Sequence, residues 1–262
     1  MRPAAATVPL FQPVKLVPGY RVVSSAIEDH IVRGELQAGT LLPTEQALAQ
    51  QFGVNRSTVR EAIRQLEQEG LVTRQGARRL YVTLPGVHDI APRAARALLM
   101  QHVTFQELWQ VALVLEAQAA SLAARCASAE DLAQLKLLVQ RMAEHHKRGG
   151  DAEAHAELDI EFHAAVARAS GNRVLMLARE PINLLYRPSL MRLQQQLPQA
   201  ERRNLEAHRR VLDAIAAHDA DEAGEWMRKH LVDFQRGYAL AGIPMDTPLR
   251  PQHPAPTKET SL

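Results

Sequence analysis

The pattern of residues 42–82 constrains the fold more than any other part of the chain. Thr44 is a plausible N-cap for a short apolar helix, which Gly53 ends in a tight turn. Asn55 can then cap a further helix, whose apolar residues face inward until Gly70 stops it. The sequence therefore predicts a helix–turn–helix arrangement, with an additional helix expected upstream from about residue 20.

Arginine side chains form a stripe beside the apolar face of the helix that follows Asn55. At about 100° per residue, Arg56, Arg60 and Arg64 lie about 110° from the apolar face, so they can project outward while the helix stays packed. The major groove of DNA admits one helix, and guanidinium groups near its N-terminus can pair with guanine edges or with phosphates. The stripe therefore indicates a helix that reads DNA.

A basic β-hairpin is expected directly after this helix. Residues 71–73 and 80–82 are β-prone and flank a glycine turn rich in arginine, which predicts a β-wing. A solvated arginine face is the plain alternative, but the order of cap, turn, arginine helix and basic wing favours DNA binding. The residues expected to contact DNA are Thr44, Glu45, Asn55, Arg56, Ser57, Thr58, Arg60, Arg64, Arg74, Gly76 and Arg78.

Composition narrows the class of protein. The formal net charge is only +2, so a nucleic-acid surface must come from local clustering of arginine. Cys126 is the sole cysteine, which excludes an internal disulfide and a zinc site built from several thiolates. There is no apolar stretch of about 20 residues and no signal-like start. We expect a soluble, cytoplasmic protein.

Changes in composition along the chain predict five segments. Helical periodicity alone is found after the Pro85-Gly86 pair, which predicts a bundle of six or seven helices and a mainly α fold class. The expected segments are a mobile N-terminal tail (1–18), the DNA-binding domain (19–84), a linker (85–88), the all-helical domain (89–242) and a Pro-rich mobile tail (243–262).

Acidic and histidine side chains of the helical region have the spacing of a metal site. Asp159 and His163 lie four residues apart on one helix, while His208 and His230 fall in two others. Three imidazoles and a carboxylate suit Zn²⁺, Ni²⁺ or Mn²⁺ and can leave positions open for water or a ligand oxygen. From spacing alone, an ordinary surface pair of Asp and His is the more common interpretation.

The other histidines of this region match no ligand motif. His145 and His146 sit in a polar stretch that ends in Lys147 and Arg148. We expect these two side chains, together with His155 and His218, to lie on solvated helix faces.

The first domain resembles the winged helix-turn-helix of the GntR family of bacterial transcription regulators. The resemblance covers about sixty residues and rests on Leu42-Pro43-Thr44-Glu45, Leu48-Ala49, Phe52-Gly53-Val54-Asn55-Arg56, Val59-Arg60-Glu61-Ala62 and Leu66-Glu67-Gln68-Glu69-Gly70-Leu71-Val72. It implies operator contacts from Arg56 and Arg60, with Asn55, Ser57 and Thr58 near phosphates or bases.

The second domain resembles the all-helical FCD-type effector domain of the FadR branch of that family. The matching runs are Leu158-Asp159-Ile160-Glu161-Phe162-His163, Ala169-Ser170-Gly171-Asn172, Glu206-Ala207-His208-Arg209-Arg210-Val211-Leu212 and Met227-Arg228-Lys229-His230-Leu231. The resemblance implies that Asp159, His163, His208 and His230 bind a metal ion.

Glu116 lies in a segment that resembles the long opening helix of that domain. Members of the family usually carry an arginine four residues before this glutamate, where it commonly helps to hold a ligand carboxylate; here the position is Ala112. Three alternatives follow. The effector lacks that contact, another arginine such as Arg187 or Arg192 supplies it, or the site no longer senses a small acid.

These patterns together predict a ligand-responsive transcription regulator and not an enzyme. We expect a homodimer that binds a palindromic operator and represses a metabolic operon, with a metal-anchored small organic acid as effector. The alternatives are a metal-dependent hydrolase, for which no pocket carboxylate is assignable as general base, and a metal-stabilised regulator without an effector.

Overall fold

The chain forms two compact units, Met1–Gly86 and Val87–Leu262, in the computed structural model. Each unit has a hydrophobic core of its own. The structure describes residues 17–76, 79–149, 151–197 and 199–250.

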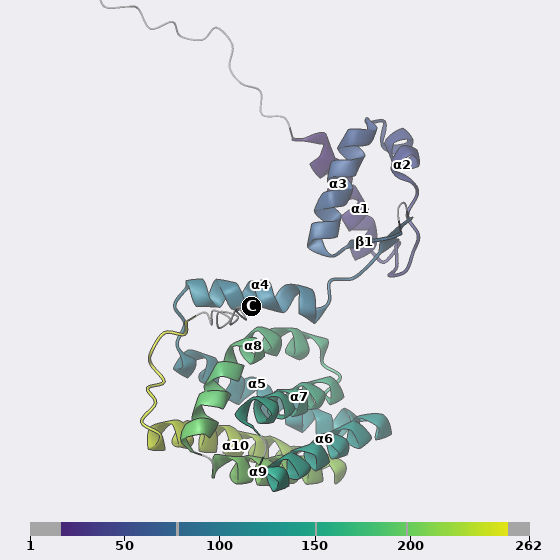
Figure 1. The fold of residues 1–262 in the computed structure, drawn as a ribbon. Helices are drawn as coiled ribbons and strands as arrows, with labels where there is room; N and C mark the ends of the chain where they lie inside the picture. Colours follow the sequence, from purple (N-terminus) through teal and green to yellow (C-terminus); the bar gives the residue numbers. More distant parts are fainter. Residues whose placement is uncertain (1–16, 77–78, 150, 198, 251–262) are drawn as a thin grey trace, which may run out of the picture. The chain divides into compact units, whose positions relative to one another are not determined.

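Three helices and a two-stranded hairpin make up the described part of the N-terminal unit. They are α1 (Gly19–Val32), α2 (Glu45–Phe52), α3 (Arg56–Glu69), β1 (Val72–Gln75) and β2 (Arg79–Val82) (Figure 1). The strands pair antiparallel, with Val72 opposite Val82, and both of these side chains are buried. The order of elements expected from residues 42–82 is confirmed.

Local capping sets the ends of α2 and α3. The Thr44 hydroxyl accepts from the Ala47 amide at 3.2 Å, and the Asn55 side-chain oxygen accepts from the Thr58 amide at 2.9 Å. Each bond satisfies an amide that has no partner within its helix. Gly53 and Gly70 end the two helices in the left-handed conformation, with φ of 65° and 78°.

The described part of the second unit consists of seven helices, within the predicted six or seven. They are α4 (Val87–Met100), α5 (Phe105–Cys126), α6 (Ala129–Arg148), α7 (Ala152–Ala169), α8 (Arg173–Gln196), α9 (Ala200–Ala216) and α10 (Ala220–Leu240). Within this unit, α4 and α8 lie on one side and α6 and α9 on the other (Figure 1). No helix among the described residues is long and apolar enough to cross a membrane.

Small residues bring α5 and α10 close together in the core of this unit. Ala119, Ala120 and Ala123 of α5 are completely buried. On α10, a Cβ atom added to Gly224 would stand 3.3 Å from the carbonyl oxygen of Ala117, which is tighter than most real contacts. This close packing holds α10 firmly against α5, and both helices contribute side chains to the site described below.

The helical unit extends further in both directions than the boundaries predicted from the sequence, residues 89–242. Helix α4 begins at Val87, within the expected linker 85–88. Residues 243–250, expected to be a mobile tail, lie against the helices instead. Ile243 is only 6% exposed, and the Leu249 amide donates to the carbonyl of Val103 at 2.9 Å. Proline prevents a helix there but does not prevent burial of the apolar residues between the prolines. The rest of that predicted tail, residues 251–262, lies outside the described residues, as do residues 1–16 of the N-terminal one.

Candidate functional site

The arginine stripe of α3 faces solvent. The side chains of Arg56 and Arg64 are 72% and 63% exposed, and Arg60 is also exposed. The opposite face of the helix, which includes Val59 and Ile63, is completely buried. The division of faces expected from the helical period is therefore present, and the guanidinium groups are free to approach a partner.

A single carboxylate organises the cationic groups around the start of α3. Glu45 at the start of α2 accepts from Arg56 through one oxygen, with Nε at 3.4 Å, and from Arg74 on β1 through the other, with Nη2 at 3.3 Å. Arg74 also reaches Glu67 at 3.2 Å. Because Glu45 is mostly buried, it orients two arginines from different elements toward the same surface.

The polar residues at the start of α3 are bound to one another. The side-chain oxygen of Asn55 accepts from the hydroxyl groups of Ser57 and Thr58, both at 2.7 Å, in addition to the Thr58 amide. Gly76, where the wing turn begins, has a φ of 65°, which favours glycine. Arg78, the further predicted contact on the wing, lies outside the described residues.

Four side chains that could hold a metal ion, referred to below as metal-binding in this sense only, converge in the core of the helical unit. Asp159 and His163 come from α7, His208 from α9 and His230 from α10, and one ligand atom from each lies within 4.8 Å of all the others. His163 Nε2 is 3.2 Å from His230 Nε2, and His208 Nε2 is 3.5 Å from an Asp159 oxygen. All four residues are at least nine-tenths buried. The tertiary structure thus assembles the predicted donor set.

The protonation of two of these histidines, His208 and His230, suits a metal ion. Burial and the neighbouring histidines lower the pKa of His208 well below its usual value and that of His230 to about 4. Both imidazoles are therefore neutral near pH 7, as metal ligands must be. The Nε2 atom of His208 is buried and has no hydrogen-bond partner. Such an atom is costly to leave unpaired, so the site fits a cation placed among the four donors.

Glu116 of α5 sets the orientation and raises the pKa of His163, the third imidazole. His163 Nδ1 donates to a Glu116 oxygen at 3.0 Å, which leaves Nε2 to face His230 and Asp159. Burial opposes the charge on His163, but the Glu116 carboxylate outweighs it and raises the His163 pKa. A carboxylate behind a histidine ligand fixes the ring orientation and increases its basicity.

A buried arginine balances the charge of Glu116. Arg179 of α8 donates from Nε to the other Glu116 oxygen at 2.8 Å and from Nη2 to Asn183 at 2.7 Å. Burial disfavours the carboxylate, but Arg179 and His163 lower the pKa of Glu116 to about 2. The site thus contains an ion pair that the sequence analysis did not find. The available signal was the position of Arg179, four residues after Leu175 and three before Ile182, on the buried face of α8.

The two arginines proposed from the sequence lie elsewhere. Arg187 donates to Glu153 and Glu157, both at 2.8 Å, on the surface of the unit. Arg192 is exposed and lines a different cavity. Neither contributes to the cavity beside the four metal-binding side chains. One face of α8 is directed toward the core along its length, and Arg187 and Arg192 fall outside that face.

A small, mostly apolar cavity opens beside the four metal-binding side chains. Its volume is about 30 Å³, and its lining consists of Ala112, Glu116, Asp159, Ile160, His163, Ile182, Asn183, Tyr186, Leu190, His230, Leu231 and Phe234. Among them, Tyr186 has a buried hydroxyl group without a hydrogen-bond partner. An oxygen atom of a ligand would give that hydroxyl the partner it lacks.

The expectation of solvated surface is wrong for most of the remaining histidines. His155 is 3% exposed, and the His145 and His146 side chains are only 12% and 37% exposed. A ring nitrogen of each of these three side chains lies within 3.6 Å of a carboxylate oxygen of Glu201, a residue of α9. His218 is exposed, as expected.

Two family models match the chain, one in each unit. The model described as "Bacterial regulatory proteins, gntR family" matches residues 19–82. The model described as "FCD domain" matches residues 107–233, a range that includes Asp159, His163, His208 and His230.

Curated relatives match along most of their length. The chain is 32% identical over 213 residues to the HTH-type transcriptional regulator LutR of Bacillus subtilis, which covers 78% of this chain and 94% of the relative. It is 29% identical over 248 residues to the Glc operon transcriptional activator of Escherichia coli, covering 86% and 94%. Among solved structures, the GntR protein of Streptococcus agalactiae matches with a TM-score of 0.59 and 25% identity, covering 83% of this chain and 99% of that one.

Proposed function

The chain belongs to the GntR family of bacterial regulatory proteins and carries an FCD domain, and from this premise we propose an effector-controlled repressor of a metabolic operon. It is a DNA-binding transcription regulator and not an enzyme. The proposal adds a homodimer, a palindromic operator and a small organic acid that is held through a metal ion. The argument for each addition follows.

The exposed arginines of the capped helix α3 carry the DNA-binding part of the proposal. Arg56 and Arg60 project from the N-terminal half of a helix whose opposite face is buried, which is the geometry that a groove-inserted helix needs. Arg60 has no partner among the described residues, and Arg56 makes only a long contact to Glu45. One such helix contacts only a short stretch of bases, so two copies related by two-fold symmetry would read two half-sites of a palindrome.

A divalent metal ion, Zn²⁺, Ni²⁺ or Mn²⁺, would be held by Asp159, His163, His208 and His230. Four protein donors are enough to bind such an ion. When the ion takes a coordination number above four, a ligand oxygen can occupy the additional position. The ion would supply a fixed positive charge in the core of the helical unit. The orphaned Nε2 atom of His208 and the Glu116 contact that orients His163 support this assignment.

The effector pocket lies between this donor set and the apolar side chains of α8 and α10. No arginine lines it among the described residues, and the nearby Arg179 already donates to Glu116 and Asn183. Of the alternatives left open by Ala112, we therefore favour an acid whose carboxylate is held by the metal ion and not by a guanidinium group. Tyr186 would donate to a second oxygen of that acid. Since the cavity measures only about 30 Å³, helices that line it must move apart when the acid binds.

Movement of those helices is the proposed signal. An acid that binds one arrangement of the helical domain better than another shifts the population of dimer geometries. The separation of the two DNA-reading helices changes with it, and so does operator affinity. The Glc operon relative is an activator by name. We nevertheless propose repression for this chain, and an operator-linked reporter tests the sign.

The DNA-binding part is tested with duplexes selected from a random pool by the purified protein. Alanine at both Arg56 and Arg60 is expected to weaken binding of the selected duplex at least about 30-fold, since each well-placed arginine contributes roughly 1–3 kcal/mol. The matched control replaces Arg209 and Arg210, exposed arginines of the other unit, and should bind normally. Equal affinity of the wild type and the Arg56→Ala/Arg60→Ala variant would refute the proposal.

The effector part is tested by thermal denaturation with a panel of short mono- and dicarboxylic acids. An acid that binds the folded state is expected to raise the melting temperature of the Zn²⁺-loaded protein and to have no effect on the EDTA-treated protein. A shift by Zn²⁺ alone, with no acid producing a further shift or a change in operator binding, would support the metal-stabilised regulator without an effector.

A further inference from the structure

A second cluster of histidines lies in the helical unit, next to the four metal-binding side chains already described. His145 and His146 come from the last turn of α6, His155 from α7, and Glu201 from the first turn of α9. One Glu201 oxygen lies 3.2 Å from His145 Nδ1 and 3.6 Å from His155 Nδ1. The other oxygen lies 3.4 Å from His146 Nδ1. We refer to these four residues as the Glu201 cluster.

The nitrogen atoms of the Glu201 cluster are poorly satisfied by the protein. His145 Nε2, His146 Nδ1 and His155 Nδ1 are all buried without a hydrogen-bond partner. Buried polar atoms of this kind are rare in native proteins. Of the three, His155 Nδ1 is the one that faces the Glu201 oxygen shared with His145. Burial also lowers the pKa of His155, so its ring is neutral and carries only one proton, which either nitrogen atom can hold. A divalent cation beside Glu201 would bind His155 Nδ1 and shift the ring proton to Nε2.

We propose that the Glu201 cluster is a second divalent metal site, with His145, His155 and Glu201 as ligands. One ligand atom from each of these three residues lies within 4.8 Å of the other two. The contacts of 3.2 and 3.6 Å from Glu201 approach the edge of about 3.3 Å expected for a tetrahedron with metal–ligand bonds of roughly 2.0–2.1 Å. His146 Nδ1 lies 3.4 Å from the second oxygen of the carboxylate, outside the proposed set of ligands. Two imidazoles and a carboxylate suit Zn²⁺ or Ni²⁺, with water completing the coordination.

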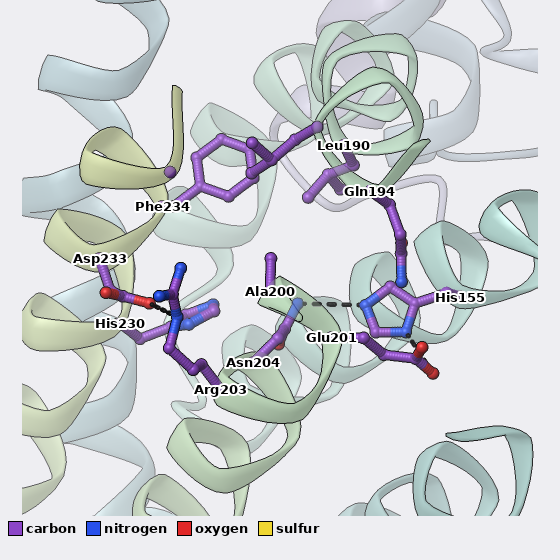
Figure 2. A pocket seen from close by; sticks show the side chains of 12 residues that line it. His155, Leu190, Gln194, Ala200, Glu201, Arg203, Asn204, His230, Asp233 and Phe234 are labelled. Carbon is purple, nitrogen blue, oxygen red and sulfur yellow. Dashed lines mark hydrogen bonds and ion pairs between the residues drawn. The ribbon is translucent and has the colours of Figure 1, made fainter. Parts of the chain in front are cut away.

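The ion can enter from solvent. The side chains of His145 and Glu201 are 12% and 13% exposed, whereas the donors of the first site are almost completely buried. Figure 2 shows His155 and Glu201 together at one side of a cavity whose other side carries His230 and Asp233. The Glu201 cluster is thus the more accessible of the two sites, so we expect its ion to exchange faster than the ion of the first site.

Asn204 joins the two sites. Its side-chain nitrogen donates to Asp159, a donor of the first site, at 2.7 Å. The same nitrogen faces His155 Nε2 at 3.3 Å (Figure 2). In this arrangement His155 Nε2 accepts, and the ring proton sits on Nδ1. An ion at Nδ1 moves the ring proton to Nε2, and the protonated Nε2 then needs a hydrogen-bond acceptor. The side-chain oxygen of Asn204, which is buried and unpaired, can become that acceptor if the amide group turns. Occupancy of one site therefore alters the hydrogen bond made to the other.

The stoichiometry of Zn²⁺ binding tests this proposal on the full-length protein. After EDTA treatment and dialysis, calorimetric titration and elemental analysis should give two Zn²⁺ per chain for the wild type and one for Glu201→Gln. The control is Glu206→Gln, the same change at an exposed position of the same helix, which should keep both ions. One ion in the wild type, or two ions in Glu201→Gln, would overturn the proposal.

A companion variant separates this proposal from the assignment of the first site. His208→Gln should lose the ion of the first site and keep the ion of the Glu201 cluster, because His208 belongs to the first site only. If His208→Gln binds no Zn²⁺ although it remains folded by circular dichroism, the Glu201 cluster does not bind the ion on its own and the proposal fails. If His208→Gln keeps both ions, the first site is wrongly assigned and the Glu201 cluster stands.

Crystals grown with Zn²⁺ give an answer that does not depend on any variant. The proposal predicts an anomalous difference peak between His145, His155 and Glu201, in addition to one among Asp159, His163, His208 and His230. A peak among Asp159, His163, His208 and His230 alone, with zinc in excess over the chain, would reject the proposed site at the Glu201 cluster.

Discussion

Arg179 on α8 and Glu116 on α5 form a buried ion pair across 63 positions of sequence, with Arg179 Nε 2.8 Å from the Glu116 carboxylate. The same carboxylate accepts from His163 at 3.0 Å, so the pair reaches the metal-binding side chains through one further contact. A guanidinium group from α8 therefore stands beside Glu116, although Ala112 of α5 provides none. Its donors are occupied within the protein, which suits a role in holding Glu116 ionised and His163 in place.

Loss of Arg179 should destabilise the helical domain strongly. Arg179→Met leaves the Glu116 carboxylate buried without its main partner, which costs roughly 3–5 kcal/mol in the free energy of unfolding. The additional change Glu116→Gln removes the stranded charge and should restore a large part of that loss. Urea unfolding of the metal-free proteins measures both effects.

The matched control is Arg187→Met, on the same helix as Arg179. It breaks an exposed pair with Glu153 and Glu157 of α7. Exposed pairs contribute about 0–1 kcal/mol, so this variant should unfold nearly as the wild type does. Equal losses for Arg179→Met and Arg187→Met would show that the buried pair has no special weight.

Tyr186→Phe should weaken effector binding without destabilising the ligand-free protein. The hydroxyl of Tyr186 is buried and has no partner, so its removal relieves an unsatisfied group while deleting the donor proposed for the acid. We expect the affinity for an acid found in the thermal panel to fall about threefold to tenfold, the usual contribution of one hydrogen bond. Isothermal titration gives the affinity, and thermal denaturation gives the stability.

Tyr238→Phe is the corresponding control, because Tyr238 lines a different cavity. It should leave the affinity for the acid unchanged. A Tyr186→Phe protein that binds the acid as tightly as the wild type would exclude Tyr186 from the binding site.

Glu45→Gln should strengthen nonspecific DNA binding. The change removes a negative charge from the surface proposed to face DNA and frees Arg56 and Arg74 from their shared carboxylate. The dependence of log K on log salt concentration should become steeper by about 1 to 2, since one or two more phosphates are neutralised. Fluorescence anisotropy with a random-sequence duplex, measured over a range of salt concentrations, tests this.

Glu28→Gln changes the net charge of the same unit by the same amount, at an exposed position of α1, and serves as the control. A salt dependence that shifts equally in both variants would mean that net charge, and not the release of the arginines, is responsible.

Acid should destabilise the metal-free protein below about pH 6.5. His230 has a pKa of about 4 in the folded protein and 6.5 when unfolded, so between these values only the unfolded state binds the proton. The stability that neutral His230 permits is therefore complete above pH 6.5 and declines toward pH 4, by up to about 3 kcal/mol. His208 acts in the same direction, whereas the raised pKa of His163 stabilises the folded protein at low pH and partly offsets the loss.

Urea unfolding in EDTA between pH 4 and 7 measures the effect, and His230→Gln should flatten the curve. In the Zn²⁺-loaded protein the decline should be steeper, because protonation of the histidines also releases the ion. A metal-free wild type whose stability stays constant over this range would contradict the assignment of His230 as a buried neutral imidazole.

Local signals in the sequence determined the ends of the DNA-reading helices. Thr44, Asn55, Gly53 and Gly70 act within four residues of their own position, through caps and a left-handed turn, so their effect can be read without knowledge of the fold. The outward direction of Arg56 and Arg60 followed in the same way from the helical period. The four donors of the first metal site were identified through family resemblance, because spacing alone favoured an ordinary surface pair.

Only the tertiary structure decided which distant side chains meet. Arg179 reaches Glu116 because α8 packs against α5. His155 reaches Glu201 because α9, which packs against α6, brings Glu201 to the end of α6 and the start of α7. Polar neighbours in sequence made His145 and His146 look solvated, but solvent exposure depends on which helices cover a residue and not on its neighbours in the chain. Helical period gives the direction of a side chain from its own axis; the packing of the other helices decides whether that direction leads to water, to a carboxylate or to a metal ion.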